Sequence, residues 1–382
     1  MRQANDELAS LRESGLLRHL RVLDPDPAPF LLLQGRRIVN FASNDYLGLS
    51  RDAELIAAAQ EATARFGAGS GSSRLICGSF SPHHELEDTV AAWKGTEAAL
   101  TFSNGYATAV GTLTSILRKG DMVILDKLSH ASLIDGARLS EATLRVFPHN
   151  NLDKLARLLS KARDRLPASA RVLVVTESIF SMDGDRAPLV ELVDLADRYG
   201  ALLLVDEAHA VGIVGRNGEG LAAELGIQQG ITFQMGTLGK AVGSAGGYLA
   251  AERQWIDLIL NNARSFIFST APPPAQTASS RRALEIITSA RGRELRKRLW
   301  TNIAVFAALR NEEIQSAILP IVIGENDPTL RAAQNLLDAG FLAPAVRFPS
   351  VPRGSARLRI TLSAAHDENQ VRDLHAVLTA LP

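Results

Sequence analysis

Several features that mark common classes of protein are scarce or absent in this sequence. A single cysteine, Cys77, excludes an internal disulfide and fits a reducing compartment. The 41 lysines and arginines equal the 41 aspartates and glutamates in number, which argues against an electrostatic binder of nucleic acids or membranes. No apolar run approaches about 18 residues, and residues 1–8 lack the apolar core of a signal peptide. We therefore expect a soluble, cytoplasmic protein that binds neither nucleic acid nor membrane.

A helicase-like nucleotide site is excluded, because the sequence lacks the phosphate loop that such a site requires. The sequence Asp-Glu-Ala-His at 206–209 also occurs in nucleotide-driven helicases, which require a phosphate loop of the form G-x-x-x-x-G-K-[ST]. Here Gln234 occupies the first glycine position before Gly239, and Ala241 follows Lys240 where a serine or threonine is needed. The residues at 206–209 therefore need another explanation.

Two further motifs are incomplete. The glycine-rich stretch at 67–72 follows a predicted helix rather than a strand, and it lacks the third glycine of a dinucleotide fingerprint. His83 and His84 are neighbours that point apart on a helix, and no other ligand at a suitable spacing completes a metal site. We therefore expect neither a bound dinucleotide nor a metal ion.

The pattern of apolar runs predicts a mainly parallel α/β sheet. Near-continuous apolar runs, as expected of strands covered by helices on both faces, lie at 99–102, 122–125, 171–176, 201–205, 231–235 and 247–250. Helical patterns separate these runs, among them those at 105–118, 152–165 and 188–199. We divide the chain into an N-terminal helix and arm at 1–50, a large α/β domain at 51–280 and a small α+β domain at 281–382.

The N-terminal region predicts one helix and one polar turn. Leucines at helical spacing indicate an amphipathic helix over residues 1–20, with Arg18 at its end. On its own, this arginine fits a solvated face or a partner of the helix dipole. Residues 38–50 predict a short strand followed by a polar turn with Asn44 at its tip.

Lys240 lies in a segment whose small side chains let the backbone and a bound molecule approach closely. Five of the thirteen residues at 235–247 are glycines. A desolvated lysine is nucleophilic and forms Schiff bases with carbonyl groups. A lysine in an ordinary solvated loop is the alternative, so the interpretation of Lys240 depends on residues elsewhere in the chain.

Other polar residues follow predicted strands at their carboxyl ends, where ligands bind to such sheets. Asp206 ends a buried apolar strand, so its carboxylate needs a cation or hydrogen-bond donors. The turn at 103–106 presents backbone N–H groups and a helix N-terminus that suit a phosphate, although it also fits an ordinary connection. His130 could stack on a flat ring or be structural. Ser181 offers a hydroxyl group toward the same crevice.

Together, these residues are the parts of a pyridoxal 5'-phosphate (PLP) site: an anion seat, an acid for the pyridinium nitrogen and a lysine. The sequence resembles the α-oxoamine synthases, which are fold-type I PLP-dependent transferases, over almost its whole length. The motifs that carry the resemblance follow in the family's order and lie at 40–48, 129–132, 177–185, 206–209, 237–240 and 357–361.

The resemblance implies a role for each matching residue at the cofactor. Lys240 would form the Schiff base, Asp206 would keep the ring nitrogen protonated, and His209 would contact the ring hydroxyl. His130 would stack on the ring and contact the substrate, and Ser181 would reach the cofactor. The phosphate would bind to Gly105, Tyr106 and Thr237.

The resemblance also implies how substrates bind. Asn44 and Arg359 would hold the carboxylate of the amino acid. Ser350 matches a position where the family more often has threonine, and it keeps the hydroxyl group for a contact with the acyl chain. Arg18 matches an arginine that meets the far carboxylate of the acyl chain.

The implied reaction is a decarboxylative condensation. Lys240 would remove the α-proton of an amino acid, which then attacks an acyl thioester on coenzyme A or an acyl-carrier protein. The resemblance is strongest to the branch that joins L-alanine to a pimeloyl thioester to make 8-amino-7-oxononanoate for biotin. A sister branch, such as glycine C-acetyltransferase, is the alternative, and a non-catalytic cofactor-binding protein is a third. A homodimer is expected, with 269–273 as the segment that crosses between subunits.

Overall fold

The computed structural model describes residues 4–381, and the chain divides into two compact units. The first unit combines the residues up to Gly48 with Ser181–Asp185 and the chain from Lys297 onward. The second unit combines Leu49–Phe180 with Arg186–Arg296. Among the described residues, no helix has both the length and the apolar character needed to cross a membrane.

The second unit is built on a seven-stranded sheet with the order β4-β10-β9-β8-β7-β5-β6. Its strands are β4 (Ala98–Phe102), β5 (Met122–Asp126), β6 (Thr143–Phe147), β7 (Val172–Glu177), β8 (Leu202–Asp206), β9 (Phe233–Thr237) and β10 (Gly247–Ala251). Only β10 runs antiparallel to its neighbours; the remaining ladders are parallel. The six strands expected from apolar runs are all present. The edge strand β6 was not expected, because its middle residues are exposed and its sequence is not continuously apolar.

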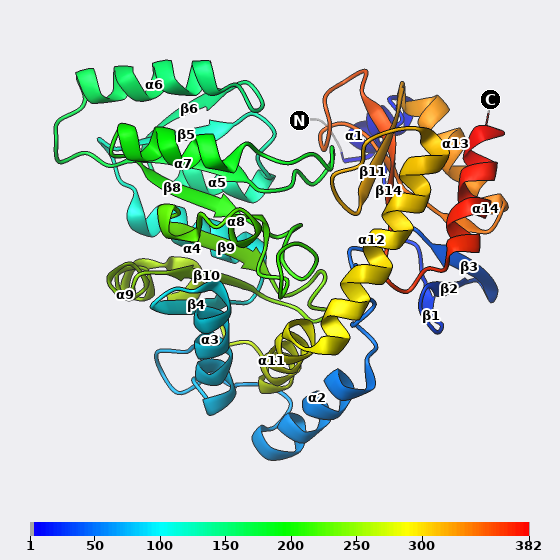
Figure 1. The fold of residues 1–382 in the computed structure, drawn as a ribbon, viewed down its shortest axis with the longest axis horizontal. Helices are drawn as coiled ribbons and strands as arrows, with labels where there is room; N and C mark the ends of the chain where they lie inside the picture. Colours follow the sequence, from blue (N-terminus) through cyan, green and yellow to red (C-terminus); the bar gives the residue numbers. More distant parts are fainter. Residues whose placement is uncertain (1–3, 382) are drawn as a thin grey trace. The chain divides into compact units, whose positions relative to one another are not determined.

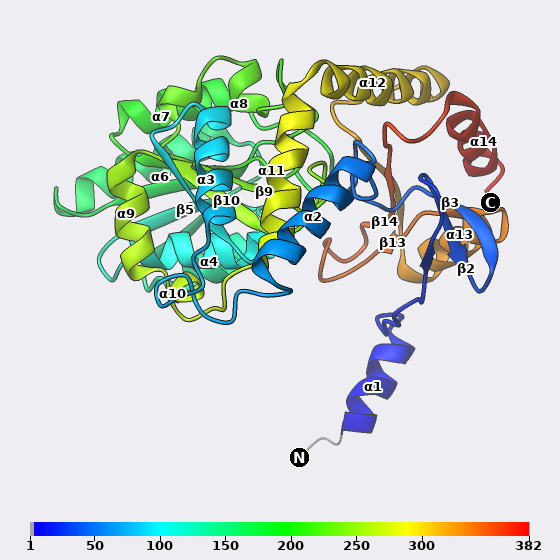
Figure 2. The ribbon, with the colours of Figure 1, turned by 90° about the horizontal axis from the view of Figure 1, so that it is seen from below.

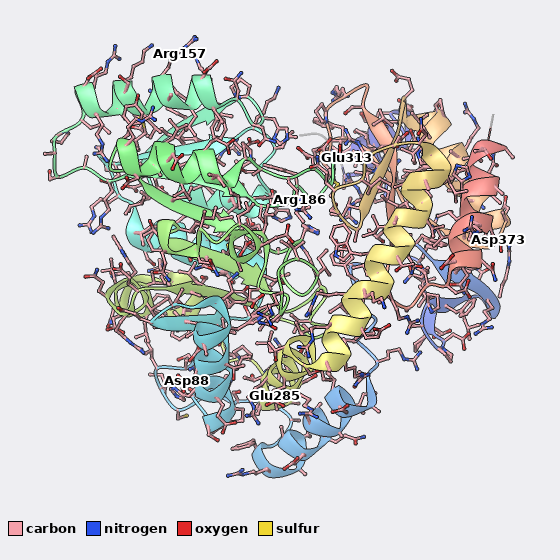
Figure 3. The ribbon with its side chains drawn as sticks, in the orientation of Figure 1. Asp88, Arg157, Arg186, Glu285, Glu313 and Asp373 are labelled. Carbon is pink, nitrogen blue, oxygen red and sulfur yellow. The ribbon has the colours of Figure 1, made fainter. Side chains whose placement is uncertain are left out.

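Helices lie on both faces of this sheet (Figure 1). The helices of this unit are α2 (Ala53–Phe66), α3 (Ser81–Lys94), α4 (Gly105–Ile116), α5 (Ala131–Leu139), α6 (Leu152–Arg165), α7 (Leu189–Arg198), α8 (Leu221–Glu224), α9 (Arg253–Asn262), α10 (Arg264–Ile267) and α11 (Pro274–Thr288). The helices α2, α3 and α11 lie side by side (Figure 2). Some charged side chains of the helices face solvent, among them Asp88 on α3 and Arg157 on α6 (Figure 3).

An apolar core joins the sheet to the helices on one of its faces. Leu113 of α4, Phe233 of β9 and Ile259 of α9 are fully buried members of this core. All six residues of β7 are buried. Burial on both faces is what a near-continuous apolar strand requires, so the sheet provides a rigid edge on which polar residues can be held.

The first unit contains two smaller sheets. One has the order β1 (Asp24–Pro25), β2 (Phe30–Leu33), β3 (Arg36–Asn40) and β12 (Phe341–Leu342), and the other has the order β11 (Ile318–Gly324), β14 (Ala356–Thr361) and β13 (Ala345–Val346). Its helices are α1 (Ala4–Glu13), α13 (Asn326–Asp338) and α14 (Glu368–Thr379). The helix α12 (Ala290–Arg310) begins in the second unit and ends in the first.

The opening helix is shorter than the sequence predicted. It ends at Glu13, and Gly15 adopts a left-handed conformation with φ of 65°. The N–H groups of Leu16 and Leu17 donate back to the carbonyl oxygen of Leu11, which closes the helix end. Arg18 therefore lies beyond the helix rather than at its end, and its interpretation as a partner of the helix dipole is wrong.

A fully buried ion pair fastens α3 to the end of β8. Lys94 Nζ lies 2.5 Å from Glu207 Oε2, and both side chains have 0% exposure. The ammonium group also donates to the carbonyl oxygen of Glu219. Glu207 Oε1 accepts a hydrogen bond from the Ala222 N–H at 3.0 Å. Because each charge is buried, removal of one partner leaves the other uncompensated.

We expect Lys94→Met to lower the free energy of unfolding by about 3–5 kcal/mol, the usual cost of an unpaired buried charge. The double variant Lys94→Met/Glu207→Gln should recover most of this loss, because no charge remains and glutamine still accepts from Ala222. Urea denaturation of the three proteins measures both effects. A single variant as stable as the natural protein would contradict the expectation.

Candidate functional site

Strand pairing brings several carboxyl ends to one edge of the large sheet. Gly247 of β10 pairs with Phe102 of β4 on one side and with Thr237 of β9 on the other. Asp206, the last residue of β8, pairs with Met235 of β9 in a parallel ladder. The residues that follow β4, β8 and β9 therefore emerge side by side, as the sequence predicted for a ligand site.

The first turn of α4 forms an anion seat at this edge. Asn104 caps the helix, since its Oδ1 accepts from the Ala107 N–H at 2.8 Å. The N–H groups of Gly105 and Tyr106 precede this cap contact and have no intrahelical acceptor. With the positive end of the helix behind them, they suit a phosphate.

Glycine and threonine shape the walls of the seat. A Cβ on Gly247 would lie 2.4 Å from Thr108 Oγ1 and 2.8 Å from the Gly105 nitrogen, so a side chain there would displace the helix start. A Cβ on Gly105 would lie 3.9 Å from Thr237 Oγ1, which places this hydroxyl beside the turn. The structure thus brings Gly105 and Thr237 together, as expected of two phosphate ligands.

Tyr106 presents its ring outward from the same turn. Its side chain is exposed, and its hydroxyl donates to Asp135 Oδ2 at 2.8 Å. This hydrogen bond raises the pKa of Tyr106. The hydroxyl is thereby committed to Asp135, and the contribution of Tyr106 to the seat comes from its backbone N–H.

Lys240 and His209 form a direct pair. Lys240 Nζ lies 2.7 Å from His209 Nε2, and the imidazole is buried while the lysine is half-buried. A lysine amine can donate to a neutral imidazole or accept from its N–H, so the pair can hold a proton between the two nitrogens.

Asp206 is a buried carboxylate whose neighbours affect its pKa in opposite directions. Its Oδ1 accepts from the Ala208 N–H at 2.9 Å. Burial raises the pKa of Asp206, whereas the charge of Lys240, the Ala208 N–H and His130 oppose this shift. Lys240 therefore supplies part of the positive charge that the buried Asp206 carboxylate was expected to need.

His130 caps α5 with its ring toward the same edge. Its Nδ1 lies 2.8 Å from Ser132 Oγ, and its backbone N–H donates to Glu177 Oε1 at 2.6 Å. Burial lowers the pKa of His130, an effect that the charge of Asp206 opposes. Glu177 was missed as a site residue in the sequence, although it is an acid at the carboxyl end of a buried strand, the same signal that identified Asp206.

The chemistry of these donors fits PLP. Orphan N–H groups at a helix start suit a phosphate, a buried carboxylate suits a protonated ring nitrogen, and a primary amine suits an aldehyde. The residues that could hold the cofactor in this unit are Gly105, Tyr106, His130, Asp206, His209, Thr237 and Lys240.

The first unit holds a second cluster, made by Arg359, Asn44 and Ser181. Arg359 on β14 is buried; its Nε donates to the carbonyl oxygen of Ser181 at 2.7 Å and its Nη1 to Asn44 Oδ1 at 3.1 Å. The structure thus brings the two residues predicted to hold a carboxylate into contact. Ser181 contacts them through its backbone carbonyl.

Arg18 and Ser350 lie near one another around the turn at 347–350. Arg18 Nη2 donates to the carbonyl oxygen of Phe348 at 3.2 Å, and Arg347 donates to the carbonyl oxygen of Gly15. Burial and the charge of Arg18 lower the pKa of Arg347. Two guanidinium groups are therefore held near each other by carbonyl oxygens, next to the exposed Ser350.

A buried histidine that the sequence did not single out supports the Asn44 turn. His366 Nε2 lies 3.0 Å from the Asn40 carbonyl oxygen, and its Nδ1 accepts from the Ser363 N–H at 2.9 Å. Its ring stacks on Phe41 with centroids 4.1 Å apart. Burial lowers the pKa of His366 to about 4.

This histidine should make stability fall with acidity. Because its pKa is lower in the folded protein than in the unfolded chain, the unfolded state binds the proton first as the pH falls. We expect the free energy of unfolding to fall by about 3 kcal/mol between pH 6.5 and pH 4 because of His366. Urea denaturation across this range should show a shallower pH dependence for His366→Gln. Coincident slopes for the two proteins would contradict the expectation.

Comparison with known proteins identifies relatives over nearly the full length. Residues 36–378 match the family described as aminotransferase class I and II. The 8-amino-7-oxononanoate synthase of Geobacter sulfurreducens is 44% identical over 98% of this chain and 96% of its own. That of Anaeromyxobacter dehalogenans is 46% identical over 98% of this chain and 94% of its own.

Solved structures agree with this assignment. A serine palmitoyltransferase from S. paucimobilis with a bound PLP–myriocin aldimine is 31% identical, covers 99% of this chain and 96% of its own, and gives a TM-score of 0.91. An 8-amino-7-oxononanoate synthase from Francisella tularensis is 25% identical over 90% of this chain and 97% of its own, with a TM-score of 0.76. The predicted fold class, that of fold-type I PLP-dependent transferases, is confirmed. The chain belongs to the aminotransferase class I and II family and, within it, to the α-oxoamine synthases.

Proposed function

We propose that this protein uses PLP to condense L-alanine with a pimeloyl thioester, with loss of CO2, to give 8-amino-7-oxononanoate in biotin biosynthesis. The observation that carries the proposal is the gathering of Lys240, His209 and Asp206 at the sheet edge where the first turn of α4 forms an anion seat. Relatives with 44% and 46% identity that are named for this activity support the choice of substrates.

The residues of the second unit have distinct parts in holding the cofactor. The N–H groups of Gly105 and Tyr106, with the Thr237 hydroxyl, would take the phosphate. Asp206 would take the ring nitrogen, and His209 the ring hydroxyl. When bound, PLP supplies an electron sink for negative charge at the α-carbon of the amino acid.

Lys240 is the candidate for moving the proton. With PLP bound, its amine would hold the cofactor aldehyde, and as a free amine it would take the α-proton as general base. The 2.7 Å contact with His209 gives that proton a second nitrogen on which to reside. Asp206 would keep the ring nitrogen positive, and the nearby charge of Lys240 favours the ionised carboxylate that this requires.

Substrate recognition falls to residues of the first unit. Arg359 and Asn44 would bind the amino-acid carboxylate through N–H donors, while Ser181 would donate to the cofactor. Ser350 would contact the acyl chain and Arg18 its far carboxylate. The charge of Arg347 beside Arg18 favours an acyl donor with an anionic end, which pimeloyl provides and an acetyl or palmitoyl chain does not.

A sister activity is the second candidate, because the serine palmitoyltransferase structure gives the higher TM-score of the two solved relatives, 0.91 against 0.76. Steady-state assays with alanine, glycine or serine against pimeloyl, acetyl or palmitoyl thioesters separate the candidates. Each pimeloyl donor should be offered both on coenzyme A and on an acyl-carrier protein. Highest kcat/KM for glycine with acetyl or serine with palmitoyl would replace our proposal with the sister activity.

Lys240→Ala should lower turnover of alanine with the pimeloyl thioester by at least about 10³-fold, since both covalent attachment and proton removal are lost. Thiol release measures the rate, and borohydride should no longer fix the cofactor to the chain. Turnover like that of the natural protein in this variant would refute the proposed role.

We also propose that the protein is a homodimer, because an apolar patch on the second unit is left uncovered. The patch comprises Leu75, Ile76 and Phe268, with Ile76 79% and Phe268 70% exposed. A backbone bridge between Ser73 and Thr270 holds the two segments together. Such patches mark protein interfaces, and a second copy of the same chain is the usual partner. The patch adjoins the segment at 269–273 that the sequence suggested for the subunit crossing.

Phe268→Glu should shift the protein from dimer to monomer at micromolar concentration, because a carboxylate would be buried at the interface. Sedimentation velocity measures the change. Val190→Glu, at an exposed apolar position of α7 outside the patch, is the matched control and should leave the dimer intact. A dimer that persists in Phe268→Glu would place the interface elsewhere.

A further inference from the structure

The amide of Asn44 has an orientation that its neighbours dictate. Its Oδ1 accepts from Arg359 Nη1 at 3.1 Å and from the Tyr46 hydroxyl at 3.2 Å. A guanidinium group has donors and no acceptor, so the oxygen of Asn44, rather than its nitrogen, must face Arg359. The amide –NH2 is consequently directed away from both neighbours.

Tyr46 is suited to hold this orientation permanently. Its side chain has 0% exposure, so the phenol cannot exchange Asn44 for bulk water. Burial raises the pKa of Tyr46 to about 12, against the opposing effect of Arg359. The hydroxyl therefore keeps its proton throughout the working pH range.

The backbone around Asn44 is fixed independently of these side chains. The Ala364 N–H donates to the Tyr46 carbonyl oxygen at 2.8 Å, and Ser363 Oγ donates to the Asp45 carbonyl oxygen at 2.8 Å. The Tyr46 N–H donates to the Asn44 carbonyl oxygen at 2.8 Å. With the backbone held, the main remaining freedom is rotation of the Asn44 amide, which Tyr46 and Arg359 oppose.

We propose that Tyr46 is a positioning residue for the amino-acid carboxylate: by donating to the Asn44 oxygen beside Arg359, it steadies the amide with its –NH2 turned toward the substrate. This rests on the proposed function, in which Asn44 and Arg359 bind that carboxylate. With the amide so turned, the cluster offers N–H donors from both residues. A flipped amide would instead present its oxygen to the negative charge of the substrate and repel it.

The fixed orientation of the Asn44 amide should also make the cluster prefer a substrate carboxylate to an uncharged amide. A substrate amide can present either a donor or an acceptor, so it tolerates both orientations of Asn44. A carboxylate only accepts, so it requires the orientation that Arg359 dictates and that the Tyr46 hydroxyl reinforces. Loss of the hydroxyl should therefore weaken binding of L-alanine while leaving binding of L-alaninamide nearly unchanged.

The test is Tyr46→Phe in the PLP-loaded protein, a change that keeps the ring and removes one hydrogen bond. Spectral titration without acyl thioester should show a Kd for L-alanine about fivefold higher, the effect of a single hydrogen bond. The ratio of Kd values for L-alaninamide and L-alanine should fall by the same factor, and kcat should change less than about twofold. Unchanged Kd values and an unchanged ratio would overturn the proposal.

Tyr248→Phe is the matched control. Tyr248 is also a tyrosine with 0% exposure, and its hydroxyl has no hydrogen-bond partner among the described residues. Removal of this hydroxyl should leave the alanine Kd within about twofold of the natural value. An equal rise in both tyrosine variants would show a general effect of core perturbation and would overturn the specific role of Tyr46.

A double-mutant cycle with Asn44→Ala tests whether Tyr46 acts through the amide. In the Asn44→Ala background, Tyr46→Phe should change the alanine Kd by less than about twofold, because no amide remains to orient. A full fivefold effect in that background would contradict the proposal. Failure of the pimeloyl assay refutes the proposed function alone, because these binding ratios do not depend on the acyl donor.

Discussion

The backbone pairing of Gly247 with two strands is the constraint on which the candidate site depends. It brings the ends of β4 and β9 to one edge, and the absence of a side chain lets the first turn of α4 pack against β10. The glycine-rich character of 235–247 thus has a packing cause. At Gly236, similarly, a Cβ would lie 2.4 Å from the Tyr248 hydroxyl on the neighbouring strand. Close approach of backbones, rather than flexibility, explains these two glycines.

Two adjacent acids at the end of β8 meet the cost of burial in different ways. Asp206 ends β8 and Glu207 follows it, and the two side chains have different surroundings. Glu207 is neutralised internally by Lys94, with hydrogen bonds that complete the pair. Burial raises the pKa of Asp206, although the charge of Lys240, the Ala208 N–H and the charge of His130 oppose this shift. A buried carboxylate with a raised pKa is available to a cationic ligand.

Local sequence patterns predicted the elements whose bounds depend on neighbouring residues. They failed where a contact between residues distant in the sequence determines the structure. The helix predicted at 152–165 has the same bounds in the structure, because its apolar stripe and its Asn151 cap are local. The opening helix was predicted to be longer than it is, because Gly15 adopts a left-handed conformation that the leucine spacing does not indicate. Asn44 and Arg359 are 315 residues apart in the sequence, so no local pattern could join them, and only the resemblance to the family did. Tyr46 was absent from the sequence-based site for the same reason, since its role depends on that contact.

Similarity of fold and identity of substrate depend on different parts of the molecule. The sheet edge would serve the cofactor, so any α-oxoamine synthase with the same strand order has reason to keep it, whatever its acyl donor. The choice of acyl donor depends instead on the charges of Arg18 and Arg347. Among residues 4–381, neither guanidinium forms an ion pair with a carboxylate, and each donates to a carbonyl oxygen instead. A donor with a negative end would relieve the repulsion between them, whereas an uncharged chain would leave it in place. For this reason the two arginines weigh more than overall similarity in favour of a dicarboxylic acyl donor.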